Sequence, residues 1–182
     1  DQFKAIFDTC WALCYLHTRE PSIIHGDLKG TNIIMERDPL RSDSFRAKLL
    51  DFGLSRVLTR HVGRMSGTTM WIAPEVLRGE HAHLSADTFS FGRLSFFILT
   101  GVFPFSRSLT RRQMVQILES GSLPALAWPR ATSKIAEESR WWVEACSDCE
   151  PSRRPSMEDM AKVLMGMLKE PVAELVLDIL QE

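Results

Sequence analysis

Three short segments of the sequence hold the side chains whose types and spacing could support catalysis. They are His25-Gly26-Asp27-Leu28-Lys29-Gly30-Thr31-Asn32, Asp51-Phe52-Gly53 and Ala73-Pro74-Glu75. A carboxylate such as Asp27 can accept a proton from a hydroxyl. The oxygens of Asn32 and Asp51 are hard ligands of the kind that Mg²⁺ prefers. Each of these residues taken alone is better explained as a solvated charge or a turn former, so the evidence lies in their combination.

In this order and at these separations, the segments resemble the protein kinase family, whose motifs include H-R-D-L-K-x-x-N, D-F-G and A-P-E. Two further segments strengthen the resemblance. The segment from Asp87 to Gly92 is similar to a D-x-W-S-x-G helix start with Phe89 in place of tryptophan. Arg154-Pro155 is similar to the late arginine that pairs with the glutamate of A-P-E. The resemblance covers nearly the whole chain, and five ordered motifs are much stronger evidence than one tripeptide.

The resemblance implies transfer of a phosphoryl group from ATP, a reaction that depends on positioning and charge neutralisation. It implies that Asp27 accepts or orients the proton of the attacking hydroxyl and that Lys29 places a cation near the phosphate. Asn32 and Asp51 would hold Mg²⁺ and, with Lys29, the ATP. Thr68 matches the threonine that contacts the catalytic aspartate and lysine in serine/threonine kinases. The lysine in D-L-K-x-x-N also resembles that class, so the implied substrates are Ser or Thr residues of proteins.

Other residues would hold the site together. By resemblance, His25 bonds to backbone around the Asp51-Phe52-Gly53 segment, in which Gly53 permits a sharp turn. Asp87 would cap amides of the catalytic loop from a buried helix. Glu75 and Arg154 would form a buried ion pair, although both could instead be exposed charges. The motif Gly-Thr-x-x-Trp-Ile-Ala-Pro-Glu, which begins at Gly67, is most similar to the motif of the tyrosine-kinase-like group.

The sequence departs from the family pattern in two respects. Gly26 replaces the arginine of H-R-D, which gathers a phosphorylated activation loop, so we expect little control by loop phosphorylation. No glycine precedes Gly26, and no V-A-I-K-like strand fits within residues 1–24. We therefore expect residues 1–170 to be a kinase C-terminal lobe, a fragment of the α+β two-lobed fold, without the N-terminal lobe of the same protein. Such a fragment would bind ATP poorly, and an inactive kinase-like scaffold or truncated product stays an alternative.

Apolar periodicity predicts about six helices and little sheet. The helices are expected over residues 2–17, 86–99, 110–121, 135–146, 156–167 and 171–182, the last one amphipathic. Short extended pieces are expected at Ile23-Ile24 and at 32–35, a solvated hairpin or insertion at 36–46, a buried strand at 47–50 and a long loop at 54–72. This pattern predicts a mainly α fold with a small β-ribbon.

Composition excludes several other functions. The 22 Lys and Arg residues nearly balance 23 Asp and Glu residues, which argues against nucleic-acid or membrane binding driven by bulk charge. No apolar run approaches the roughly 20 residues of a membrane-spanning helix, and the chain opens without a signal peptide. Cys146 and Cys149 form a C-x-x-C pair, which could be part of a zinc site. The four cysteines are better explained as small hydrophobic residues that pack in the core. Unpaired cysteines fit a reducing, cytoplasmic compartment.

Overall fold

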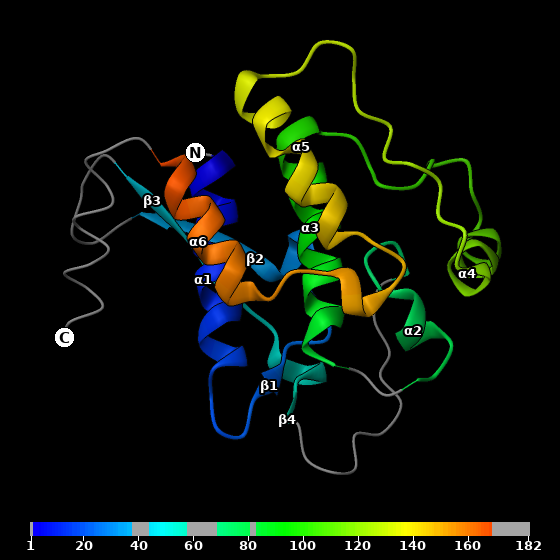
Figure 1. Ribbon diagram of the computed structural model, residues 1–182, viewed down its shortest axis with the longest axis horizontal. Helices are drawn as coiled ribbons and strands as arrows, with labels where there is room; N and C mark the ends of the chain where they lie inside the picture. Colours follow the sequence, from blue (N-terminus) through cyan, green and yellow to red (C-terminus); the bar gives the residue numbers. More distant parts are fainter. Residues whose placement is uncertain (1, 38–43, 58–68, 81–82, 169–182) are drawn as a thin grey trace.

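The computed structural model describes residues 2–37, 44–57, 69–80 and 83–168, and it is mainly helical (Figure 1). The helices are α1 (Gln2–His17), α2 (Pro74–Leu77), α3 (Leu84–Thr100), α4 (Arg111–Ser120), α5 (Lys134–Cys146) and α6 (Met157–Met167). The strands are β1 (Ile23–Ile24), β2 (Ile33–Arg37), β3 (Phe45–Leu49) and β4 (Arg56–Val57). The predicted mainly α class with a small β component is confirmed, whereas the helix expected over 171–182 lies outside the described residues.

The helix α3 lies at the centre of the molecule and carries the core (Figure 1). It packs against α1 and α5, and α1 packs in turn against α6 and β3. One apolar cluster joins these helices through side chains such as Leu13, Phe91, Trp142 and Leu164, all at most 1% exposed. A second cluster around Phe89 includes residues of α2 and α4. Each such side chain contributes about 1.5–3 kcal/mol when buried, so α3 is a rigid base for the segments that it touches.

The strands form two antiparallel pairs, β1 with β4 and β2 with β3. The strand expected at 47–50 is present as β3, but the prediction that it is buried is wrong. Leu49 is only half-buried, and Phe45 and Leu50 are 41% and 36% exposed. The reason is that β3 packs against α1, while side chains on the other face of a hairpin point away from that helix.

The long loop expected over 54–72 is also only partly correct. Residues 56–57 pair with β1 as β4, and residues 58–68 lie outside the description. The four-residue helix α2 was not predicted, because one helical turn is too short to show apolar periodicity. The helix expected over 110–121 is present as α4: a capping box of Thr110 and Gln113 starts it, and Gly121 ends it with φ 68°.

The cysteines lie as small hydrophobic residues do. Cys10 and Cys146 are fully buried and unpaired, and burial raises the pKa of both thiols. Within the described ranges, no group of three or more His, Cys, Asp or Glu residues could hold a metal ion. Within the same ranges, no helix is both long and apolar enough to cross a membrane.

At Gly92, α3 lies against α5 with no room for a side chain, which gives a direct test of this packing. A Cβ atom there would lie 2.6 Å from the Cβ of Cys146 and 2.7 Å from the Oγ of Ser147. We expect Gly92→Ala to lower the free energy of unfolding by about 1–3 kcal/mol, because the helices must separate. Chemical denaturation measures this. The control is Gly166→Ala in α6, where an added Cβ atom would meet no atom within 4 Å apart from the backbone of its own helix. Alanine there should stabilise the helix by roughly 0.5–1 kcal/mol. Equal stability of the two variants would contradict the packing.

Candidate active site

In the segment from His25 to Asn32, the predicted catalytic loop, two side chains converge on the carboxylate of Asp27. The Nζ of Lys29 donates to Oδ2 of Asp27 at 2.5 Å, and the side-chain amide of Asn32 donates to the same oxygen at 3.3 Å. The amide of Asn32 also donates to the carbonyl oxygen of Asp27 at 2.8 Å. A single 3-10 turn over Gly30–Asn32 brings Asn32 back to Asp27. The result is a carboxylate, 8% exposed, whose orientation is set by a cation and an amide.

The second carboxylate, Asp51, reaches the same region through its neighbour Leu50. The backbone N–H of Leu50 donates to the carbonyl oxygen of Asn32 at 2.8 Å, and Nε2 of His25 lies 3.0 Å from the carbonyl oxygen of Leu50. Asp51 itself is exposed and adopts φ 61°, a left-handed conformation that aspartate tolerates better than most residues. The N–H of Gly53 donates to Oδ1 of Asp51 at 3.1 Å. The structure therefore brings Asp51 beside the catalytic-loop segment.

The side-chain oxygens of Asn32 and Asp51 are suitable ligands for a hard divalent cation. The side-chain N–H of Asn32 donates to the carbonyl oxygen of Asp27, so the amide oxygen of Asn32 remains as an acceptor. Asp51 is exposed and supplies carboxylate oxygens. Oxygen ligands of this kind, completed by water and phosphate, are what Mg²⁺ prefers.

The buried Asp87 of α3 holds the start of the catalytic loop. Its Oδ2 accepts from the backbone N–H of His25 at 2.7 Å, and its Oδ1 accepts from the N–H of Gly26 at 2.9 Å. Gly26 has φ 80°, a region that favours glycine, so the residue found here fits the turn. Nε2 of His17, at the end of α1, lies 3.0 Å from Oδ2 of Asp87. This contact of His17 was not predicted, since a histidine that ends an apolar helix carries no distinctive signal.

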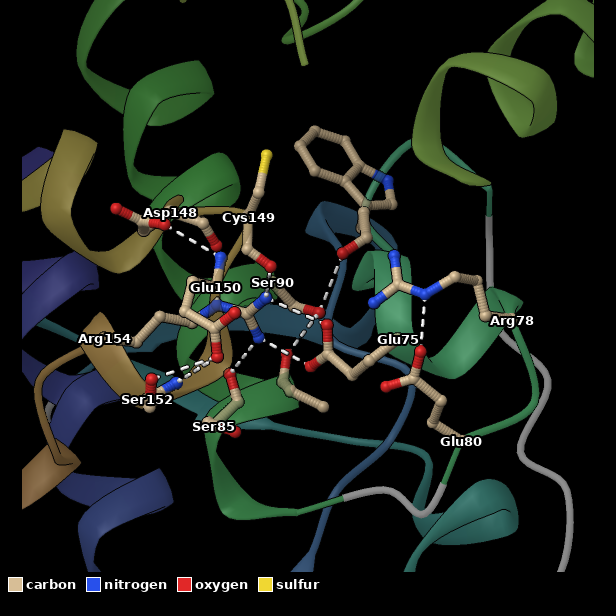
Figure 2. A network of polar contacts seen from close by, with 12 residues as sticks. Glu75, Arg78, Glu80, Ser85, Ser90, Asp148, Cys149, Glu150, Ser152 and Arg154 are labelled. Carbon is tan, nitrogen blue, oxygen red and sulfur yellow. Dashed lines mark hydrogen bonds and ion pairs between the residues drawn. The ribbon is translucent and has the colours of Figure 1, made fainter. Parts of the chain in front are cut away.

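The pair of Glu75 and Arg154 is buried, which rules out the alternative of two exposed charges. Their side chains are 4% and 0% exposed, and two parallel bonds of 2.6 and 2.9 Å join them. Figure 2 shows how the guanidinium also reaches three backbone carbonyl oxygens, those of Ser85, Asp148 and Cys149, at 3.0, 2.7 and 3.2 Å. All five N–H donors of the guanidinium are thereby engaged. This network ties α2 to the start of α3 and to the turn after α5.

The segment that leads into α2 is also held by helix α3. The carbonyl oxygen of Trp71 accepts a hydrogen bond from Oγ of Ser90 in α3 at 2.8 Å. The indole ring of Trp71 packs edge-on against the ring of Phe97, with 5.9 Å between the ring centres. Thr68, expected in the catalytic set, lies outside the described residues. Its neighbour Thr69 is buried and accepts a hydrogen bond from Nε of Arg111 at 3.1 Å.

Residues 2–164 match the family model described as protein kinase domain. A putative serine/threonine-protein kinase/receptor R818 of Acanthamoeba polyphaga mimivirus is 34% identical over 168 residues, 92% of this chain and 9% of the relative. The probable serine/threonine-protein kinase drkD of Dictyostelium discoideum is 34% identical over 166 residues, 90% of this chain and 12% of the relative. The serine/threonine-protein kinase STY46 of Arabidopsis thaliana is 31% identical over 172 residues, 92% of this chain and 27% of the relative. The chain thus spans from about a tenth to about a quarter of the length of these relatives.

Proposed function

Because this chain belongs to the protein kinase domain family, we propose that it is the catalytic part of a protein serine/threonine kinase. The reaction is transfer of the γ-phosphate of ATP to Ser or Thr hydroxyls of protein substrates. The observation that carries this proposal is the convergence of Lys29 and Asn32 on Asp27, with Asp51 held beside them through Leu50. The kinase names of the relatives support the same choice.

In this proposal the chain's residues work by orientation and charge. Asp27 receives or orients the proton of the substrate hydroxyl, and the hydrogen bonds from Lys29 and Asn32 hold its carboxylate in one direction. Lys29 is 22% exposed along its side chain, so its ammonium can also lie beside an incoming phosphate. Asn32 and Asp51 hold Mg²⁺, which neutralises negative charge on the ATP phosphates. His25, Gly53 and Asp87 keep these groups in place.

Residues 1–170 act in this proposal as the C-terminal lobe, and an N-terminal lobe of the same protein completes the ATP site. Exposed apolar side chains on Phe52, which follows Asp51, and on strand β2, which follows Asn32, support this division. Phe52 is 51% exposed, and Ile34 and Met35 on β2 are 47% and 41% exposed. Exposed apolar side chains near a polar site are typical of a region that another part of the protein covers.

The proposal is tested by incubating the full-length protein with γ-labelled ATP, Mg²⁺ and a mixed protein substrate, followed by phosphoamino-acid analysis. We expect label on phosphoserine or phosphothreonine. Label on phosphotyrosine alone would contradict the assigned specificity. Nucleotide binding without any transfer would favour the alternative of an inactive scaffold.

The variant Asp51→Asn should weaken binding of the magnesium–nucleotide complex more than it affects the fold. Asparagine has the same size and can still accept the hydrogen bond from Gly53, but it lacks the negative charge. We expect the Mg²⁺ concentration for half-maximal activity to rise about tenfold or more, equivalent to roughly 1.4 kcal/mol. A magnesium titration at fixed ATP measures this. The control is Glu119→Gln, an exposed residue of α4, which should leave the titration unchanged. A parental magnesium requirement in Asp51→Asn would contradict the assignment of this ligand.

A further inference from the structure

A groove of about 610 Å³ lies between helix α4 and the segments that flank it. Its walls are largely apolar: Val102, Phe103, Pro104, Phe105, Leu109 and Ile117. We refer to it as the α4 groove. Figure 1 shows α4 at the edge of the molecule, and Asp27, Lys29, Asn32 and Asp51 are not among the residues that line the groove. The α4 groove is therefore separate from the candidate active site.

One cation lines the α4 groove, and two more lie at the start of the helix that borders it. Arg107 lines the groove, with its guanidinium 5.2 Å from the centre of the Phe103 ring. Arg111 and Arg112 follow at the start of α4, and all three arginines are exposed. The sequence from Thr88 to Leu118 contains no Asp or Glu. The ion pairs formed within the described ranges do not include any of these three arginines.

The hydrogen bond from Nε of Arg111 to Thr69 fixes one of these arginines in position. An arginine held in this way loses less conformational entropy when it binds a carboxylate, because its planar fork is already oriented. The stacked Arg107 is similarly restrained by the face of Phe103. The surface thus combines an apolar hollow with a restrained arginine at its wall, Arg107, and a second restrained arginine on the neighbouring helix α4.

We propose that the α4 groove binds an acidic segment of a partner protein, in which leucine or phenylalanine side chains enter the hollow and flanking Asp or Glu residues meet the arginines. The volume of the α4 groove, about 610 Å³, lies within the range of volumes of small-ligand sites. The groove can therefore accommodate apolar side chains. The apolar walls favour a peptide over nucleic acid, whose binding depends on neutralising many phosphates. The net charge of −1 for the whole chain makes this positive surface a local feature. The interaction does not depend on phosphotransfer.

The test is fluorescence anisotropy with the full-length protein and a labelled peptide that carries a central Leu-Phe pair flanked by Asp and Glu. A matched peptide has the same centre flanked by Lys. We expect the acidic peptide to bind about tenfold or more tightly than the lysine peptide, with an affinity that falls as salt is added. Equal affinities for the two peptides would overturn the proposal. Preferential binding to anionic lipid vesicles, with no binding of the acidic peptide, would overturn it as well.

Two variants locate the binding site. Arg107→Glu reverses the charge at the wall, and Ala125→Trp fills the groove from an exposed position that also lines it. We expect each to weaken binding of the acidic peptide about tenfold, while the control Arg153→Glu, at an exposed site outside the groove, changes it less than about twofold. Thermal melting checks that all three variants fold. Parental affinity in folded Arg107→Glu and Ala125→Trp would overturn the proposal.

Discussion

Replacement of Asp27 by asparagine is expected to abolish most phosphotransfer by the full-length protein while its fold stays intact. Asparagine matches aspartate in size, and its amide oxygen can still accept hydrogen bonds from Lys29 and Asn32 in place of Oδ2. What it loses is the negative charge that receives or orients the hydroxyl proton. Removing a general base of this kind typically costs about 10²–10⁴-fold in rate. We therefore expect kcat to fall by about that factor.

The measurement separates this role from nucleotide binding. Initial rates over a range of ATP concentrations should show a lowered kcat with little change in KM for ATP, whereas Asp51→Asn should change the magnesium and nucleotide requirement. Circular dichroism melting of Asp27→Asn should stay close to that of the parent, because the amide oxygen can keep the hydrogen bonds from Lys29 and Asn32. Turnover comparable to that of the parent would contradict the role assigned to Asp27. A large loss of thermal stability would show instead that its role is structural.

Arg154→Ala is expected to be the most destabilising single change among the polar residues described above. It leaves the carboxylate of Glu75 buried without its partner and removes the donor to the carbonyl oxygens of Ser85, Asp148 and Cys149 (Figure 2). Breaking a buried pair from one side costs about 3–5 kcal/mol. For a domain of this size, that corresponds to a fall in Tm of roughly 6–20 °C.

Two further variants give this prediction a sharp control. Arg140→Ala removes an arginine whose pair with Glu144 is exposed, at 57% and 49% of the side chains, so its cost should stay below about 1 kcal/mol. Arg154→Lys keeps the charge but cannot supply five donors in a planar fork, so it should recover only part of the lost stability. Chemical denaturation measures all three variants. If Arg154→Ala and Arg140→Ala were equally mild, the buried network would contribute little to stability.

The sequence predicted well those features that depend on neighbouring residues. The helix expected over 2–17 is α1 with the same bounds, and the helix expected over 110–121 begins after Thr110 at a capping box. The reason is that apolar spacing and caps act over three or four residues, within one helical turn. The convergence of Lys29 and Asn32 on Asp27 is similarly local, since six residues contain all three.

Features that depend on distant segments were predicted less well. The sequence of β3, Phe-Arg-Ala-Lys-Leu, alternates apolar and charged residues, which is typical of a strand covered on one face only. Which of its side chains helix α1 covers is decided by a contact with a distant segment. The pairing of residues 56–57 with β1 brings together segments more than 30 residues apart. The contact of His17 with Asp87 spans 70 residues, and nothing near either residue indicates it.

The sequence by itself determined which chemically active side chains the protein has, their order, and the mainly helical class that carries them. Resemblance to a family indicated partners for Asp87 and Glu75, but only the tertiary structure decided how these buried polar groups are satisfied. Asp87 accepts the amides of His25 and Gly26 across about 60 residues, and Arg154 meets Glu75 across 79. Because a buried polar group is costly without a hydrogen-bond partner, the folded path of the chain must bring such partners together, and their separation in sequence does not specify where they meet.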